Sequence, residues 1–150
     1  MSREYRHISE YENEILELKE KGLTKREIGE KLGIVEISGS VKTIVNEAFR
    51  DCTNITNIDF GSLTTINGAG VQYAFSYCIN ITSVDLSSLQ SIGFYGLASA
   101  FHDCIGLMNV DLSSLQSIGR YGMQYTFQGC EGLTNVDLSS LQSVNECGMQ

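Results

Sequence analysis

The sequence contains no proline, no tryptophan and no long apolar run among its 150 residues. A membrane-spanning helix requires roughly 20 consecutive apolar residues, so we expect no such helix. Residues 1–7 are followed by no apolar stretch, and we therefore expect no secretory signal and a cytoplasmic location. The apolar content of 42% is enough for one packed domain with a small appendage.

Positive charge is scarce in most of the chain. Residues 35–150 contain three cations (Lys42, Arg50 and Arg120) and ten acids, a net charge of −7, whereas residues 1–34 contain seven cations and eight acids. A surface that binds nucleic acid needs clustered cations. We therefore expect a protein partner with a basic surface rather than a nucleic acid.

Two sequence blocks recur with one shared 26-residue period. The block Val-Asp-Leu-Ser-Ser-Leu-Gln-Ser starts at Val84, Val110 and Val136, and a divergent copy starts at Ile58. The block Phe-x-x-Cys has four copies, which start at Phe49, Phe75, Phe101 and Phe127. A fixed period of this length is typical of a solenoid, in which stacked coils bury one continuous core. Alternation in Val-Asp-Leu predicts a strand, and Phe-x-x-Cys favours a short helix on the opposite side.

The combined pattern Ala-Phe-x-x-Cys-x-x-Leu-x-x-Val-x-Leu resembles the BspA-type leucine-rich repeat. The resemblance covers residues 35–150, as about five units, mostly 26-residue ones, with the last one incomplete. It implies an α/β solenoid: a right-handed coil with a parallel sheet on one face and short helices on the other. It also implies binding of a protein or ligand without catalysis, and no cofactor. The 26-residue units carry an insertion around residues 94–97 relative to the usual unit.

Residues 1–34 have a different, charged and helical pattern. Ser9-x-x-Glu12 and Thr24-x-x-Glu27 are capping boxes, each at the start of an apolar helical stripe. The segment resembles the start of a transposase-type helix-turn-helix, but a strand pattern begins at Ile34, where the recognition helix would stand. We expect a two-helix N-terminal cap for the solenoid. A DNA-binding regulator that uses these helices is a weaker alternative.

The cysteines and histidines do not form a convincing metal or catalytic site. Cys52, Cys78, Cys104 and Cys130 repeat with the same period and without a Cys-x-x-Cys pair, so we expect buried thiols and no metal. Cys147 lies outside this column. His102 precedes Asp103, but no counterpart recurs in other units, and we expect no enzyme activity.

An acidic column is the first candidate binding surface. The same outward strand position is acidic in five successive units: Glu36, Asp59, Asp85, Asp111 and Asp137. Neighbouring strands lie about 4.8 Å apart, so these carboxylates should form a line that could receive lysine or arginine from a partner. Asn109 and Asn135 belong to the same candidate partner-binding surface. Alternatively, each carboxylate is paired locally with a neighbouring side chain, that of Asn57, Asn109, Asn135 or Ser83.

Tyr95 and Tyr121 are the second candidate surface, because tyrosine is enriched at binding hot spots. We expect a non-enzymatic protein-binding module that engages its partner through the acidic repeated surface. An alternative is a phage or mobile-element inhibitor, acting in a phage host, that occludes the basic nucleic-acid site of a host defence nuclease (anti-CRISPR-like). The last unit stops at Gln150 before its Phe-x-x-Cys block, and an open coil predicts self-association there.

Overall fold

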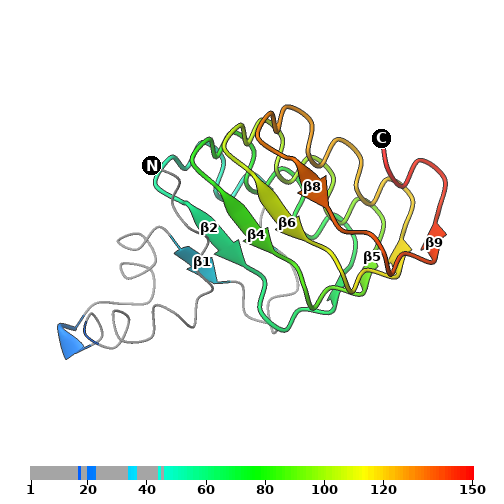
Figure 1. Ribbon diagram of the computed structural model, residues 1–150, viewed down its shortest axis with the longest axis horizontal. Coiled ribbons are helices and arrows are strands. Elements are labelled where there is room, and N and C mark those ends of the chain that lie inside the picture. The colour runs from blue at the N-terminus through cyan, green and yellow to red at the C-terminus, as the bar shows by residue number, and fades with distance from the viewer. Residues whose placement is uncertain (1–16, 18–19, 23–33, 37–43, 45) are drawn as a thin grey trace.

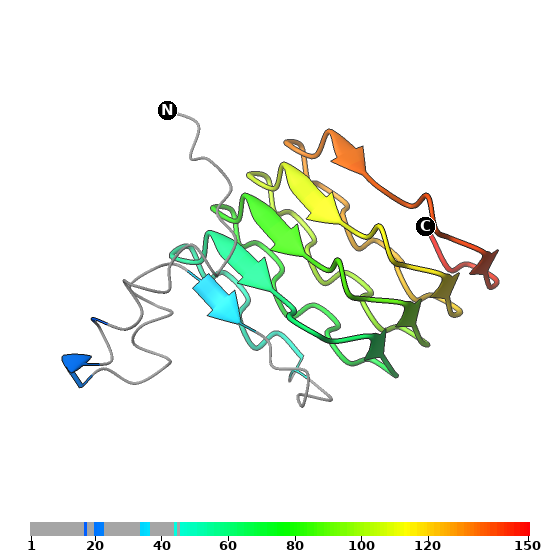
Figure 2. The same ribbon diagram turned by 60° about the horizontal axis from the view of Figure 1, so that its bottom comes forward.

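The chain winds into a solenoid in which each coil stacks on the one before it. The computed structural model describes residues 17, 20–22, 34–36, 44 and 46–150. Three coils are complete, at residues 57–82, 83–108 and 109–134, and each contains a strand of one sheet, a strand of a second sheet and a series of turns (Figures 1 and 2). The period in the sequence is therefore one full coil.

The first sheet consists of five parallel strands, one from each successive unit. They are β1 (Ile34–Glu36), β2 (Asn57–Asp59), β4 (Ser83–Asp85), β6 (Asn109–Asp111) and β8 (Asn135–Val136), in the order β1-β2-β4-β6-β8 (Figure 1). The register pairs equivalent residues, so Ile58 lies beside Val84 and Val84 beside Val110. These three side chains are buried, which confirms the expected inward position.

A second parallel sheet, which the sequence analysis did not anticipate, lies on the next side of the coil. Its strands are β3 (Thr65–Ile66), β5 (Ser91–Ile92), β7 (Ser117–Ile118) and β9 (Ser143–Val144), in the order β3-β5-β7-β9. Each strand has two residues, and the isoleucine is buried in the first three: Ile66, Ile92 and Ile118. In β9 both residues are exposed. The Ser-Ile pairs at the end of the repeated block are thus strands of this second sheet.

The third side of the coil consists of consecutive turns, not of the short helices that we expected. In residues 95–104, amides alternate between two kinds of bond. Leu97 N donates to Gly122 O of the next coil (2.8 Å), and the neighbouring Ala98 N donates to Tyr95 O within the same coil (3.2 Å). Every fourth residue here has positive φ: Tyr95, Ser99 and Asp103. A left-handed residue every four positions interrupts a helix, so the backbone pairs with the neighbouring coil instead.

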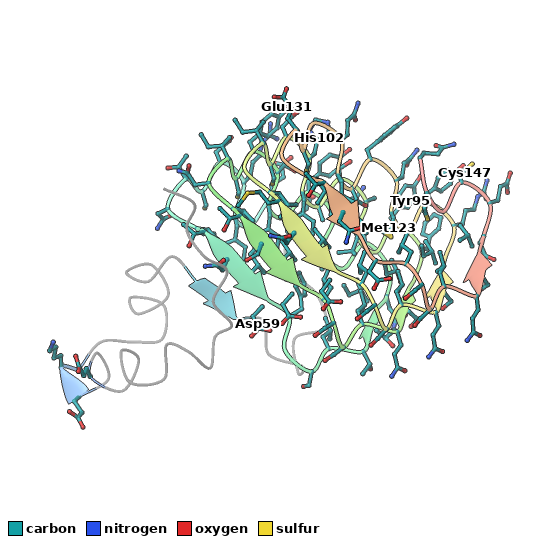
Figure 3. The ribbon with its side chains drawn as sticks, in the orientation of Figure 1. Asp59, Tyr95, His102, Met123, Glu131 and Cys147 are labelled. Atoms are coloured by element: carbon teal, nitrogen blue, oxygen red, sulfur yellow. The ribbon has the colours of Figure 1, made fainter. Side chains whose placement is uncertain are left out.

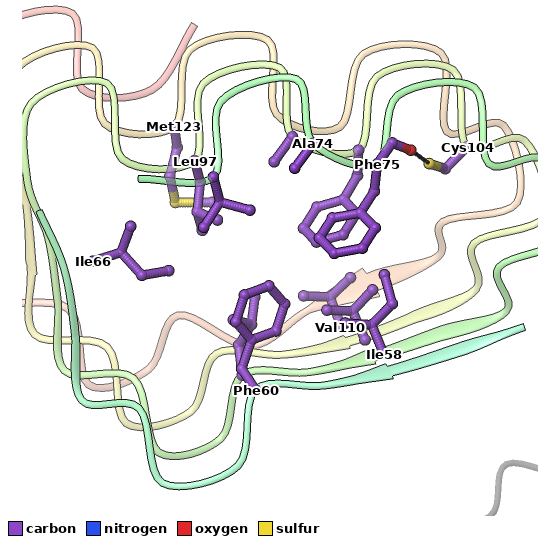
Figure 4. Packing of buried hydrophobic residues seen from close by; sticks show 14 of the residues in the cluster. Ile58, Phe60, Ile66, Ala74, Phe75, Leu97, Cys104, Val110 and Met123 are labelled. Atoms are coloured by element: carbon purple, nitrogen blue, oxygen red, sulfur yellow. Dashed lines mark hydrogen bonds between the residues drawn. The ribbon is translucent and has the colours of Figure 1, made fainter. Parts of the chain in front are cut away.

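The core is a set of ladders along the solenoid axis. The rings of Phe49, Phe75, Phe101 and Phe127 stack in sequence, with centroids 5.0, 5.6 and 6.0 Å apart. Figure 4 labels Phe75 of this ladder. Beside the rings lies the cysteine column. The Sγ of Cys104 donates to the backbone oxygen of Phe75 in the preceding coil (3.1 Å), as Figure 4 shows. The repeat therefore buries its aromatic and thiol columns together.

The thiols in this column are free, and most are buried, as the sequence predicted. Cys78, Cys104 and Cys130 are buried, whereas Cys52 and Cys147 are half-buried. Burial raises the pKa of Cys78 to about 12 and that of Cys130 to about 11, because the apolar core disfavours the thiolate. These thiols are packing groups rather than nucleophiles.

Glycine recurs at one position of successive coils, at Gly96, Gly122 and Gly148, and marks a close approach between coils. A Cβ atom at Gly96 would lie 2.8 Å from Ile92 Cγ2 and 3.1 Å from Ile66 O, and Gly122 and Gly148 are equally crowded. The three glycines have ordinary φ values. Space, rather than backbone freedom, is therefore what requires glycine here.

Most of the N-terminal segment lies outside the described residues. Within it, residues 17 and 20 are helical, Lys21 N donates to Glu17 O (3.1 Å), and Gly22 has a φ of 81°. This agrees with one helix that ends at a glycine near residue 22. The two-helix cap and the helix-turn-helix resemblance of residues 1–34 remain predictions.

Candidate functional site

The acidic column forms as a line on the first sheet. The strand register places Glu36 beside Asp59, Asp59 beside Asp85, and Asp85 beside Asp111. Asp137 follows the last strand of this sheet, one residue beyond the pair Val110–Val136. The sequence alignment of these positions was therefore right, and their role depends on what the carboxylates contact.

Each aspartate of the column accepts a hydrogen bond from the backbone amide two residues later. The bonds join the Oδ1 atoms to the amides of Gly61 (2.6 Å), Ser87 (2.9 Å), Ser113 (3.0 Å) and Ser139 (2.9 Å). An aspartate that bonds the amide two residues on stabilises a turn. The column therefore turns the chain from the first sheet towards the second in every coil, which is a structural reason for the repeat.

The carboxylates are also unequally accessible. Asp59 is only 8% exposed and Asp85 is half-buried, whereas Asp111 and Asp137 are exposed. The first residues of the strands are also unequally accessible. Ser83 is buried, and its Oγ bonds Asn57 Oδ1 (2.6 Å), whereas Asn109 and Asn135 are exposed. Among the column residues whose burial the structure describes, the exposed ones lie at the C-terminal end: Asn109, Asp111, Asn135 and Asp137.

Tyr95 and Tyr121 meet in a second cluster, at the corner where the chain leaves the second sheet. Their rings stack with centroids 4.9 Å apart and planes 14° apart. Phe94 packs edge-on against Tyr95, with centroids 4.4 Å apart, and its side chain is 55% exposed. We call Phe94, Tyr95, Arg120 and Tyr121 the corner cluster; Figure 3 labels Tyr95.

Arg120 completes the corner cluster. Its guanidinium lies over the ring of Tyr121, 4.9 Å from the centroid, and Nη2 donates to the Tyr121 hydroxyl (3.3 Å). Its Nε lies 3.7 Å from Glu146 Oε2 in the next unit. The Tyr121 hydroxyl and, less strongly, Glu146 favour the charged form and raise the Arg120 pKa. One cation thus connects two neighbouring coils across an aromatic ring.

All five tyrosines within the described residues have left-handed backbone conformations. Their φ values range from 52° to 61°. The residues are Tyr73, Tyr77, Tyr95, Tyr121 and Tyr125. Left-handed φ is uncommon for bulky side chains, and glycine or asparagine adopts it at lower cost. Glu47, Asp51, Ser99, Asp103 and Cys147 share this conformation at equivalent positions of other coils, so the backbone does not itself require tyrosine there.

A smaller polar cluster surrounds His102 on the turn side. His102 Nδ1 lies 2.8 Å from Asp103 Oδ2, and its ring lies 5.7 Å from that of Tyr77. Arg50 covers Tyr77 at 5.1 Å. The nearby hydroxyl of Ser76 and thiol of Cys104 donate to the backbone oxygens of Tyr73 and Phe75.

The two predicted binding sets do not form one surface. The acidic column lies where the first sheet ends, and the corner cluster lies beyond the second sheet; Figure 3 shows Asp59 and Tyr95 in different parts of the coil. Sequence reasoning identified Tyr95 and Tyr121 but missed Phe94 and Arg120. These two occupy the same position in successive coils, each directly before a tyrosine, which was the available signal.

The parallel strands, the 26-residue coils and the buried leucine, isoleucine and phenylalanine ladders define a leucine-rich repeat protein. The BspA type leucine rich repeat region matches residues 29–146, and the chain belongs to this family. The resemblance drawn from the repeat is thereby confirmed, whereas the match says nothing of a helix-turn-helix.

Two solved structures are similar to parts of the chain. A leucine rich cell surface protein from Faecalibacterium prausnitzii A2-165 shares 27% identity over 69% of this chain and 25% of its own, with a TM-score of 0.49. A leucine-rich repeat protein from Bacteroides ovatus ATCC 8483 shares 25% identity over 78% of this chain and 34% of its own, with a TM-score of 0.43. The chain thus spans about a quarter and a third of these proteins.

A comparison with curated proteins gave no match. Within the described residues, no helix is both long and apolar enough to cross a bilayer. The same residues contain no group of three or more histidine, cysteine or acidic side chains placed to hold a metal ion.

Proposed function

We propose that this protein is a non-enzymatic binding module that holds a protein partner at the corner cluster. The single observation that carries the proposal is the stack of Tyr95 on Tyr121, with the Arg120 guanidinium over Tyr121 and the exposed Phe94 ring against Tyr95. Tyrosine and arginine are the residue types enriched at binding hot spots, and Phe94 adds a ring that is more than half exposed. Family membership supports the same role, because leucine-rich repeats generally mediate protein interactions.

The acidic column is the weaker of the two candidate surfaces. Its aspartates already stabilise turns, and Asp59 is buried. Its exposed end, formed by Asn109, Asp111, Asn135 and Asp137, remains available as a second contact. A basic partner surface would complement the net charge of −7 over residues 35–150, and we propose this charge preference for the partner.

The inhibitor and regulator alternatives receive no support from the described residues. No observation there favours occlusion of a nuclease channel over binding in general, and the helices that a regulator would use lie outside them. Cytoplasmic location and self-association through the last coil likewise remain proposals. Cell fractionation tests the location, and light scattering at high protein concentration tests self-association, since a monomeric mass there would contradict it.

The test of the proposed function is recovery of the partner with the wild-type protein and measurement of its affinity for variants. We expect Phe94→Ala to weaken binding at least about tenfold, because an exposed ring at a hot spot contributes on the order of 2 kcal/mol. The matched control is Asp111→Asn with Asp137→Asn, which keeps the turn acceptors and removes the charge. If the double variant binds weakly and Phe94→Ala binds normally, the acidic column is the site and the corner cluster is not.

A further inference from the structure

Tyr95 has one ring face against Tyr121 and a second face directed along the solenoid axis. The Phe94 centroid lies 4.4 Å from that of Tyr95 and 6.3 Å from that of Tyr121, while the two tyrosines are 4.9 Å apart. These three distances make nearly a right angle at Tyr95. Phe94 therefore lies beside the stack of Tyr95 and Tyr121 rather than in line with it. The face of Tyr95 that is turned away from Tyr121 is directed towards the coil formed by residues 57–82.

The neighbouring coil has no large side chain at the two positions equivalent to Phe94 and Tyr95. The positions equivalent to Phe94 and Tyr95 in that preceding coil are Gly68 and Ala69, and both are exposed. A Cβ atom added at Gly68 would meet nothing within 4 Å. We call this space, bounded by the outer face of Tyr95 and by residues 68–69, the slot.

The rest of the solenoid shows what such a ring face accepts. Tyr121 bears the guanidinium of Arg120 at 4.9 Å, and because Tyr95 is only 4.9 Å from Tyr121, that guanidinium must occupy the outer face of Tyr121. Arg50 lies in the same way over Tyr77, at 5.1 Å. Both arginines of residues 46–150 thus stack on tyrosine, and the stack of Tyr95 and Tyr121 is covered by a guanidinium at one end and open at the other.

Charge selects a cation for the open end. Residues 46–150 contain two arginines and nine acidic residues, and both arginines already pair with carboxylates, Arg50 with Glu47 and Arg120 with Glu146. The surrounding field therefore favours a positive group from outside. A guanidinium suits a flat ring better than an ammonium does, because it is planar and more weakly hydrated.

We propose that the slot binds an arginine side chain of the partner, which stacks on the outer face of Tyr95 as Arg120 stacks on Tyr121. This inference rests on the proposed function and deepens it by naming the partner's contact residue. Phe94 would then pack against the aliphatic part of that arginine or its neighbours. The corner cluster would therefore recognise a cation and an adjacent apolar group of the partner at the same time.

The test measures binding of fluorescent octa-arginine and octalysine peptides by anisotropy. We expect octa-arginine to bind more tightly, and Tyr95→Leu to weaken it about two- to fivefold, the effect of losing one exposed cation–π contact. Tyr125→Leu is the control, since it removes another left-handed tyrosine away from the slot; Tyr125 is exposed, whereas Tyr95 is half-buried. Its affinity should be unchanged.

A second variant fills the slot without altering Tyr95. Ala69→Arg should place a guanidinium over Tyr95 from within the chain and weaken octa-arginine binding to a similar extent. Gln128→Arg, at an exposed position elsewhere on the turn side, adds the same charge and should have a smaller effect. Equal losses in these two variants, or equal affinities of wild type and Tyr95→Leu, would overturn the proposal.

The natural partner separates failure of this inference from failure of the proposed function. If Phe94→Ala weakens partner binding and Ala69→Arg does not, the corner cluster is the site and the arginine contact is wrong. If neither variant changes partner binding, both proposals are wrong. If both variants weaken it, both are supported.

Discussion

At the scale of single residues, the left-handed tyrosines separate what the fold requires from what the surface requires. The turn side needs a residue with positive φ every four positions, and Glu47, Ser99 and Asp103 meet this need without a ring. Tyr125 is 46% exposed and occupies the same column as Glu47 and Ser99. The backbone therefore sets the conformation at these positions and does not require a ring there.

This leads to a stability prediction at Tyr125. Tyr125→Asn should leave the free energy of unfolding unchanged or raise it by up to about 1 kcal/mol, because asparagine tolerates left-handed φ better than tyrosine does. Urea denaturation measures the change. A loss of more than about 1 kcal/mol would mean that the exposed ring supports the fold, and the functional interpretation of these tyrosines would be weakened.

At the scale of elements, the sequence was most informative where side chains repeat in register. The Val-Asp-Leu block predicted the strands of the first sheet and their alignment, because Ile58, Val84 and Val110 recur with the coil period. The second sheet was not predicted, because a strand of two residues such as Ser91–Ile92 is too short to show an alternation of apolar and polar residues. The spacing of Phe101 and Cys104 is typical of a helix. The turns that form instead depend on positive φ at Tyr95, Ser99 and Asp103, which cannot be predicted from these residue types.

The corner cluster could likewise be predicted only in part from the sequence. Tyr95 and Tyr121 could be proposed from residue type alone, but their stacking depends on a corner whose shape follows from the second sheet. The sequence identifies Arg120 only as one of few positive charges, and the structure places it over Tyr121. Conversely, the acidic column was aligned correctly, but the turn bond to Ser113 or Ser139 was not foreseen.

The turn bonds of the acidic column give a pH prediction. The Ser139 amide, and then its hydroxyl, lower the pKa of Asp137 from its ordinary 3.8. A carboxylate with a lowered folded-state pKa contributes stability above its unfolded pKa, and the contribution is lost as the pH falls through the lower folded value. Below about pH 4, the wild type should therefore lose stability more steeply than Asp137→Asn. Parallel acid titrations followed by circular dichroism measure this, and superimposable curves would contradict it.

At the scale of the whole molecule, stability resides in contacts between neighbouring coils. The ring of Phe101 stacks on Phe75 and Phe127 and is completely buried, whereas Phe127 is only partly buried against the same core. In a repeat array, each unit gains stability chiefly from the units on either side. The centre of the solenoid should therefore tolerate damage less well than its C-terminal end.

The matched pair Phe101→Leu and Phe127→Leu tests this difference. We expect Phe101→Leu to cost about 1–3 kcal/mol, since it leaves a void between two rings, and Phe127→Leu to cost less than half as much. Thermal unfolding of both variants provides the measurement. Equal losses would show that the last described coil is as tightly coupled as the middle ones.

The alternating amides of the turn side have a consequence for how such a chain can change its length. Every second amide of residues 95–103 bonds the next coil, while the ones between close turns within their own coil. An insertion or deletion of one residue there would exchange these two sets and shift the phenylalanine and cysteine ladders at the same time. Gain or loss of one complete coil would preserve the amide pattern and both ladders. Duplication of complete units therefore keeps the turn side intact, whereas a change of unit length, such as the 23 residues from Ile34 to Asn57 against the 26 from Asn57 to Ser83, must leave the turns after residue 95 in register.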